Sequence, residues 1–228
     1  MRPSPPSGKP APTAIPSFAW RPRPGSGRSR CPTSVGKEAV TGLILAGGEG
    51  RRLGGADKGL VDYRGRPLVA HAIERFAPQV ATLMISANRN IERYRRLGYP
   101  VVTDACADRL GPLAGIAAGL RACETPWLAV CPCDGPQLPA DLVGRLLAAV
   151  GDAPLAIAAT PAGPQPTFML CRRELLPALD ARISSGERGA LAWCRSQGAV
   201  QVRFPDAAAF ANLNRPEDFA AAINPAAR

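Results

Sequence analysis

The stretch TGLILAGGEGRRLGGADKGL, residues 41–60, joins a short apolar run to a glycine-rich basic loop and decides the fold class. The run at 40–46 is mostly apolar and bounded by glycine, which is typical of a strand buried on both faces of a parallel sheet. The glycines that follow allow positive φ and close approach of a ligand to the backbone N–H groups. Arg51, Arg52 and Lys58 add cations. Polyphosphate uses both features, because its oxygens accept from amides and pair with cations.

Two well-known phosphate-binding patterns do not fit this loop. The Walker A pattern ends in Gly-Lys-Ser/Thr, whereas Lys58 lies between an aspartate and a glycine. The dinucleotide pattern G-x-G-x-x-G reads Gly48, Gly50 and then Leu53, so its third glycine is missing. A hydride-transfer enzyme of the dinucleotide-binding kind is therefore disfavoured. A surface loop without a ligand is the alternative for the loop taken by itself.

The positive charge of the chain is concentrated at its start. The formal net charge is +10, and residues 1–37 contribute +7 of it because they hold seven Lys or Arg and no acid. This segment is rich in Pro, Ser, Arg and Gly without apolar periodicity, so we expect a disordered tail, with a nucleic-acid-binding arm as the alternative. Residues 38–228 carry a net charge of only +3, so we expect no nucleic-acid partner for them. Their number is sufficient for one α/β domain.

Composition also excludes several classes of site. Seven cysteines without a C-x-x-C pair, together with one histidine, predict neither a structural zinc site nor a disulfide framework, so we expect free thiols. No apolar run approaches the roughly 18 residues that span a membrane, and the tail lacks the apolar region of a secretory signal. We therefore expect a cytoplasmic protein with no membrane partner.

Beyond the loop, strand and helix signals alternate. Strands are predicted at 82–87, 100–103, 127–131, 155–159 and 167–171, and helices at 67–78, from 111 onward, at 139–150 and at 174–181. The proline-rich residues 161–166 are predicted to form a loop that faces the second substrate. Residues 212–218 read as a strand end, a turn and a helix start. The prediction is a single three-layer α/β domain with a mostly parallel, Rossmann-like sheet.

Polar side chains follow three of the predicted strands, at the edge where open parallel sheets bind ligands. Asn88 and Asp104 end two of them, and Asp134 closes the segment CPCD after the next buried strand. A carboxylate is a hard ligand suited to Mg²⁺. Nucleotidyl transfer needs positioning, charge neutralisation and Mg²⁺ rather than covalent help from the protein. Lys58, Arg52 and Asp134 are therefore the candidate catalytic residues.

In combination, LILAGGEGRRLGGADKGL, Asn88, Asp104, GPLAG and CPCD resemble the molybdenum cofactor guanylyltransferase family, from about Val40 to the terminal NLNRPED segment. The resemblance implies a fold of the nucleotide-diphospho-sugar transferase type. It also implies transfer of GMP from GTP to the phosphate of molybdopterin carrying molybdenum (Mo-molybdopterin), with Mg²⁺ required and pyrophosphate released. Proteins that insert or deliver the cofactor are further implied partners.

The resemblance also assigns residues. The positions that it places at the nucleotide are Leu45, Ala46 and Gly47 through their backbone, Lys58 at the phosphates, Asn88 and Asp104 on the base and ribose side, and Asp134. Asp134 would also bind the Mg²⁺. Asn212 and Asn214 would lie near the pterin. Asp57 and Asp108 are assigned no role.

Three alternatives stay open. A molybdopterin cytidylyltransferase or a sugar-phosphate nucleotidyltransferase would share these motifs, and the choice of guanine rests on the resemblance alone. From a different class, a nucleotide-sensing module could keep the loop without turnover. The intact Lys58 and Asp134 disfavour it, because a sensor has no leaving pyrophosphate to stabilise.

Cys131 and Cys133, beside a buried strand, are expected to be packing residues.

Overall fold

Seven strands form one sheet in the order β5-β4-β1-β6-β8-β7-β9, in a computed structural model that describes residues 36–46, 55–104, 111–214 and 217–219. All described residues belong to the unit Ser34–Arg228. The strands are β1 (Val40–Leu45), β4 (Thr82–Ser86), β5 (Val101–Val102), β6 (Trp127–Pro132), β7 (Leu155–Thr160), β8 (Gly163–Arg172) and β9 (Val200–Arg203). Only β8 runs antiparallel to its neighbours β6 and β7, so the predicted mostly parallel sheet is confirmed.

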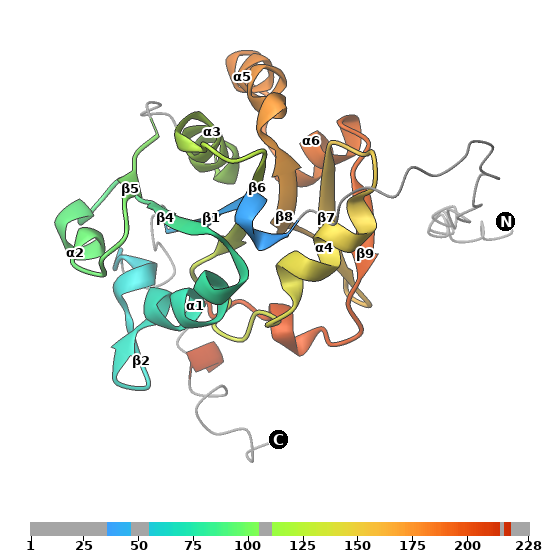
Figure 1. Ribbon diagram of the computed structural model, residues 1–228. Helices are drawn as coiled ribbons and strands as arrows, with labels where there is room; N and C mark the ends of the chain where they lie inside the picture. The colour runs from blue at the N-terminus through green and yellow to red at the C-terminus, as the bar shows by residue number, and fades with distance from the viewer. Residues whose placement is uncertain (1–35, 47–54, 105–110, 215–216, 220–228) are drawn as a thin grey trace, which may run out of the picture. The chain divides into compact units, whose positions relative to one another are not determined.

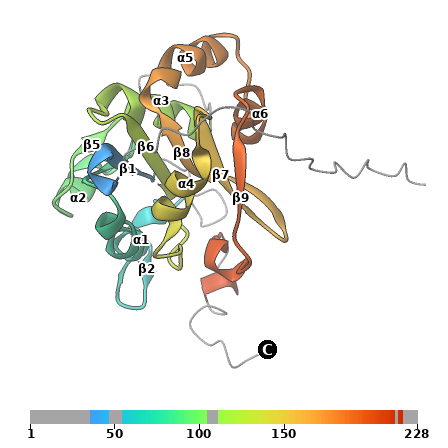
Figure 2. The same cartoon turned by 45° about the vertical axis from the view of Figure 1, so that its right-hand side comes forward.

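Helices cover both faces of the sheet (Figure 1). The α-helices are α1 (Leu68–Phe76), α2 (Ile91–Arg95), α3 (Pro112–Ala122), α4 (Leu142–Val150), α5 (Leu176–Ser184) and α6 (Ala190–Ser196). One core lies between the sheet and the helices α1 and α4, and a second lies between the sheet and α3, α5 and α6. Figure 2 shows the two groups of helices on opposite sides of the strands. The predicted three-layer architecture is confirmed.

Alternation along the central strands explains the two cores. In β6, Trp127 and Ala129 face the first core, whereas Leu128 and Val130 face the second. All six residues of β6 are buried, as expected for a strand covered on both faces. Successive side chains of a strand point to opposite faces, so this apolar run supplies both cores.

Short elements complete the fold. They are the 3-10 turns at Lys37–Ala39, Lys58–Leu60, Ala77–Gln79, Arg173–Leu175 and Ala208–Phe210, and the hairpin of β2 (Asp62–Tyr63) and β3 (Arg66–Pro67). The helix predicted from 139 begins only at Leu142, and the predicted strand at 100–103 is limited to two residues. Neither α2, α6 nor β9 was predicted, because five, seven and four residues are too few to show a clear period.

The predicted loop at 161–166 is wrong from Gly163 onward, where β8 begins. Gly163 already pairs with Thr160, and Pro164 with Ala159, so β7 and β8 form a hairpin. Among the described strands, β8 pairs here only with β7, since its pairing with β6 starts at Met169. One side of the strand is therefore an open edge, where proline does not remove a ladder hydrogen bond. The strand was not predicted in this segment because its proline-rich composition is typical of a loop.

Two helical glycines are expected to respond oppositely to alanine. A methyl group at Gly119 in α3 would lie 2.5 Å from Cδ2 and 3.2 Å from Cγ of Leu43, which is fully buried. A methyl group at Gly144 in α4 would meet no atom within 4 Å. Gly119→Ala should therefore lower the free energy of unfolding by about 1–3 kcal/mol, whereas Gly144→Ala should raise it by about 0.5–1 kcal/mol. Urea unfolding of both variants tests this, and a gain for Gly119→Ala would contradict the packing.

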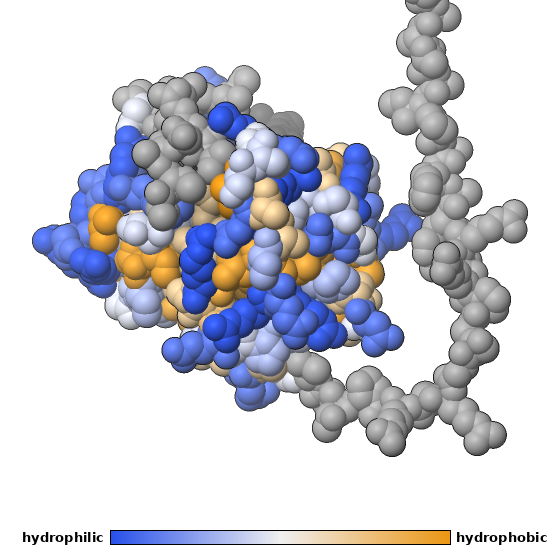
Figure 3. All heavy atoms as spheres, turned by 90° about the horizontal axis from the view of Figure 1, so that it is seen from above, coloured by the Kyte–Doolittle hydropathy of each residue, from blue (hydrophilic) through white to orange (hydrophobic). Residues whose placement is uncertain are grey.

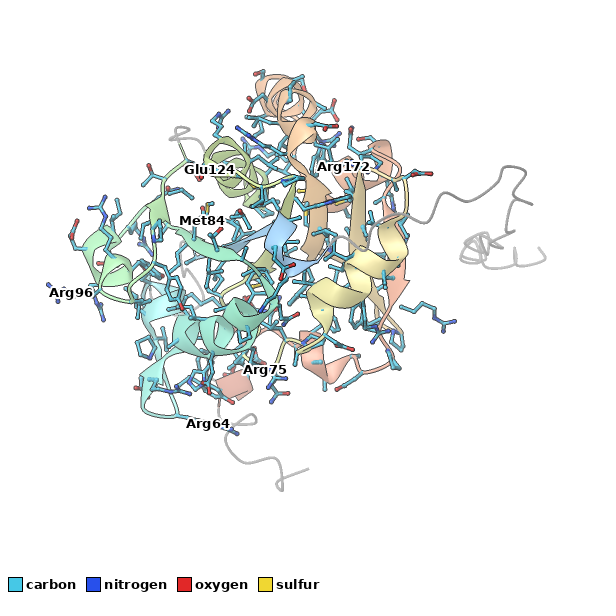
Figure 4. All side chains as sticks on the ribbon, in the orientation of Figure 1. Arg64, Arg75, Met84, Arg96, Glu124 and Arg172 are labelled. Carbon is cyan, nitrogen blue, oxygen red and sulfur yellow. The ribbon has the colours of Figure 1, made fainter. Side chains whose placement is uncertain are left out.

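Within the part of the chain that the structure describes, none of the helices has the length and apolar character needed to span a membrane. The end of the molecule at α2 is hydrophilic when seen from above (Figure 3). Its exposed side chains include Glu92, Arg93, Arg95 and Arg96. Figure 4 shows Arg96 at this periphery.

Candidate active site

Asp134 follows the carboxyl end of β6, in the middle of the sheet. The N–H of the preceding Cys133 donates to the carbonyl of Leu45 (3.0 Å), so the chain stays in register with β1 beyond the strand. Asp134 is only 9% exposed. The predicted carboxylate therefore lies at the ligand edge, held by backbone on the β1 side.

Lys58 reaches the same point from the glycine-rich loop. It begins the 3-10 turn Lys58–Leu60, and its Nζ donates to Oδ2 of Asp134. The same ammonium donates to Oδ1 of Asn214 at 2.5 Å. The Lys58 and Asp134 side chains are 14% and 12% exposed, so this ion pair is largely shielded from water. The structure thus brings together two of the predicted catalytic residues.

The terminal segment closes this site. The N–H of Leu213 donates to the carbonyl of Asp134 (3.0 Å), and the N–H of Asn214 donates to Oδ2 of Asp218 (2.8 Å). The strand end predicted at 212 is wrong, because Asn212 to Asn214 are bound by single hydrogen bonds and not by a ladder. The helix start is present at Glu217–Phe219. Asn214 therefore contacts Lys58. The sequence predicted a position near the pterin for Asn214 but did not predict this contact.

Within the part of the chain that the structure describes, two buried side-chain oxygens at this site lack a hydrogen-bond partner, namely Oδ1 of Asp134 and Oδ1 of Asn212. An unpaired buried carboxylate oxygen is costly, so it indicates a missing cation or donor. Hard oxygen atoms are what Mg²⁺ prefers, and one or two carboxylates plus substrate phosphates usually suffice. The described residues contain no group of three or more His, Cys, Asp or Glu that could hold a metal. Asp134 thus fits a divalent cation shared with a phosphate ligand.

The loop that follows Asp134 is bound to α1 and to the 3-10 turn after it. Nε of Arg75 donates to the carbonyl of Leu138 (2.6 Å), and Nε2 of Gln79 donates to that of Pro139 (2.9 Å). The labelled Arg75 extends from α1 in Figure 4. These bonds fix the path of the chain between Asp134 and α4. A separate hollow lined in part by Glu124 opens at the other end of β6, away from this site.

The predicted base-side residues also meet. Oδ1 of Asn88 accepts from the N–H of Asp104 (3.1 Å), which ties the chain after β4 to the chain after β5. The N–H of Ala46 donates to the carbonyl of Ser86 (2.8 Å), and the carbonyl of Leu45 is bound to Cys133. Those two backbone groups therefore already have partners at the ends of β4 and β6, and a nucleotide contact at Leu45 and Ala46 stays a prediction.

Part of the predicted site lies outside the described residues. The undescribed part of the site is the loop at 47–54, which includes Gly47 and Arg52. The predicted tail also lies outside the described residues, except for Gly36 and Lys37. The phosphate-binding role predicted for these positions therefore stays untested.

Comparison with known proteins identifies the family. A family model described as a MobA-like NTP transferase domain matches residues 42–202. The chain belongs to this family. A curated relative from Bordetella petrii, named molybdenum cofactor guanylyltransferase, is 50% identical over 186 residues, which cover 79% of this chain and 95% of the relative.

Solved structures agree on the fold of this MobA-like chain. Molybdopterin-guanine dinucleotide biosynthesis protein A from Archaeoglobus fulgidus has a TM-score of 0.65 and 22% identity, covering 80% of this chain and 96% of that one. The 4-diphosphocytidyl-2C-methyl-D-erythritol synthase from Anaerococcus prevotii has a TM-score of 0.67 and 12% identity, covering 84% and 100%. At these identities the likeness shows the nucleotide-diphospho-sugar transferase type of fold, and the family makes the chain a nucleotidyltransferase.

The MobA-like site contains residues to which the sequence assigned no role. Both carboxylate oxygens of Asp57 are occupied, Oδ1 by the hydroxyl of Tyr94 (2.5 Å) and Oδ2 by Nδ2 of Asn90 (3.0 Å). Asp57 directly precedes Lys58, and this adjacency was the one available signal. The sequence contained no such signal for Tyr94 or Asn90, because only folding brings α2 against the loop.

The two cysteines near Asp134 are packing residues, as predicted. Cys131 is fully buried and Cys133 is 5% exposed. Burial, with the Asp134 carboxylate adding to it, raises the pKa of the Cys133 thiol well above its usual range. Burial raises the pKa of Cys131 as well. Both therefore remain neutral thiols. Metal binding and nucleophilic attack require the thiolate, so neither role suits these two cysteines.

Proposed function

We propose that this protein is a molybdenum cofactor guanylyltransferase, which transfers GMP from GTP to the phosphate of Mo-molybdopterin and releases pyrophosphate. The observation that carries the proposal is the convergence of Lys58 and Asp134, 76 residues apart, with Oδ1 of Asp134 left unpaired. A cation donor and a free carboxylate oxygen at one buried point suit a triphosphate with a divalent metal. The name of the Bordetella petrii relative supports the guanylyl branch.

The reaction forms one bond and breaks one. An oxygen of the pterin phosphate attacks the α-phosphorus of GTP, and the bond from that phosphorus to the oxygen bridging to the β-phosphate breaks. The electron pair leaves with pyrophosphate. The nucleophile is already ionised, so the protein needs no general base, and its task is positioning and charge stabilisation.

Lys58 supplies the charge stabilisation from the protein side. An ammonium has three N–H donors, and among the described residues Asp134 and Asn214 accept two of them. The third is free for a phosphate oxygen, so Lys58 can bind the triphosphate without leaving Asn214. Arg52 and the backbone of Gly47 are proposed to bind phosphates from the adjoining loop.

Asp134 is proposed to hold Mg²⁺ through Oδ1, and the unpaired Oδ1 of Asn212 is a further oxygen that could help to hold the ion. When bound there, Mg²⁺ would neutralise negative charge on the phosphate oxygens. Asn88 and Asp104 are proposed to contact the base and ribose, with the backbone of Leu45 and Ala46 against the nucleotide. Their mutual hydrogen bond holds Asn88 and Asp104 in one arrangement.

The decisive experiment measures pyrophosphate release from GTP and from CTP, each with Mg²⁺, with and without Mo-molybdopterin. We expect release from GTP, only with the pterin, and its loss when EDTA removes the metal. Release with CTP instead would support the cytidylyltransferase, and GTP binding without release would support the nucleotide-sensing module. A sugar phosphate in place of the pterin tests the remaining alternative.

The proposal also covers the partners and the location of the protein. GTP and Mo-molybdopterin are the proposed substrates, and proteins that deliver or insert the cofactor are proposed to receive the product directly. We also propose a cytoplasmic location, which the five free thiols among the described residues support. Pull-down with cofactor-insertion proteins, compared with and without GTP, tests the hand-over.

A further inference from the structure

Asp134 pairs with the ammonium of Lys58, whereas Asp57 precedes Lys58 in the chain, and the two carboxylates differ in their partners. Asp134 has one oxygen without a partner among the described residues, whereas both oxygens of Asp57 are bound, one by Tyr94 and one by Asn90. The main-chain carbonyl of Asp57 also accepts from the N–H of Leu60 (2.9 Å). Both carboxylate oxygens of Asp57 are therefore engaged by the residues around α2, and its carbonyl is engaged by the turn that follows.

The hydroxyl that binds Asp57 is itself fixed. Tyr94 is 0% exposed, and its ring packs in the core that α1 and α4 cover. Burial raises the pKa of Tyr94, with the hydrogen bond to Asp57 adding to it, so the hydroxyl remains a donor. The charge-assisted bond at 2.5 Å therefore joins the loop to the core.

The chain passes directly over this hydroxyl. A Cβ at Gly59 would lie 2.5 Å from the oxygen of Tyr94, so the approach requires glycine. Arg89 adds two weaker contacts at 3.5 Å to the carbonyl of Gly55. The segment from Gly55 to Gly59 is thus held by Tyr94 of α2 and by Arg89 and Asn90, which precede the helix. Lys58 lies between the two residues that meet Tyr94.

We propose that Tyr94 is a positioning residue, which acts through Asp57 to keep the ammonium of Lys58 at the nucleotide phosphates. The inference rests on the proposed function only in that Lys58 binds those phosphates. Tyr94 itself is buried and does not touch the substrate. Its contribution lies in fixing the backbone of Lys58 before GTP arrives, which lowers the ordering cost of binding.

A double-mutant cycle tests whether Tyr94 acts through Lys58. Tyr94→Phe removes one oxygen and keeps the ring, and it should lower kcat/KM for GTP about tenfold or more, as expected for a bond to a charged group. In a Lys58→Met background the same change should alter kcat/KM by less than about twofold. An equal loss in both backgrounds overturns the proposal, because a general structural defect acts regardless of Lys58.

Tyr99→Phe is the matched control. Tyr99 is a second, partly buried tyrosine of the same region whose ring packs against the same core. Its hydroxyl has no hydrogen bond in the described residues, so the change should leave kcat/KM within about twofold. Asp57→Ala removes the acceptor while Tyr94 stays, and it serves should Tyr94→Phe fail to fold. It too should cost about tenfold, and only when Lys58 is present.

Hydrogen exchange gives a readout that needs no activity. The amides of Leu60 and Val61 close the turn at Asp57 and Lys58. In Tyr94→Phe they should exchange about tenfold faster, while those of the β1 strand keep their rates. Unchanged exchange overturns the positioning role. A parent protein without GTP turnover overturns the proposed function instead, and the exchange result still decides whether Tyr94 holds the loop.

Discussion

Replacement of Asp134 by asparagine is expected to lower the kcat of GMP transfer about a thousandfold or more. Asparagine keeps the shape of the side chain and can still accept from Lys58. It lacks the negative charge that the unpaired Oδ1 contributes to metal binding. Pyrophosphate release measured over a range of Mg²⁺ concentrations should show low turnover at every concentration.

The control for this variant is Asp152→Asn. Asp152 is exposed in the turn between α4 and β7, so its replacement should change neither kcat nor the dependence on Mg²⁺. Circular dichroism should show both variants folded. Retention of more than a tenth of the parent kcat in Asp134→Asn would contradict the assignment of this carboxylate to the metal.

Lys58→Met should lower kcat/KM for GTP by about a hundredfold to a thousandfold. Methionine keeps an unbranched four-atom stem but lacks the ammonium, so the phosphates lose a cation and Asp134 loses its partner. The free energy of unfolding should also fall, by about 1–3 kcal/mol, because a shielded carboxylate is left without its donor. Steady-state kinetics and urea unfolding measure the two effects separately.

Lys37→Met is the matched control, since Lys37 is an exposed lysine in the 3-10 turn before β1. It should leave both quantities unchanged. Lys58→Arg should not restore full activity, because a planar guanidinium cannot replace a compact ammonium between Asp134 and Asn214. Activity of Lys58→Met within threefold of the parent would show that this lysine does not stabilise the transferred phosphate.

Local patterns in the sequence predicted the central fold well. The apolar run at 40–46, the helix starting at Pro112 and the buried strand before Asp134 each carry their own period or boundary residues. Strands buried on both faces read as continuous apolar runs, which is why β1 and β6 were found. The family and the fold type inferred from these motifs are confirmed.

The sequence by itself thus determined the fold class, the family and the strand-end position of Asp134, because each rests on residues that are neighbours in the chain. The tertiary structure alone decided the partners of Lys58, which come from positions 76 and 156 residues away. It alone joined Asp57 to Tyr94 and paired the proline-rich start of β8 with β7. Contacts between distant residues depend on how helices and strands pack across the sheet, and no local period encodes that packing.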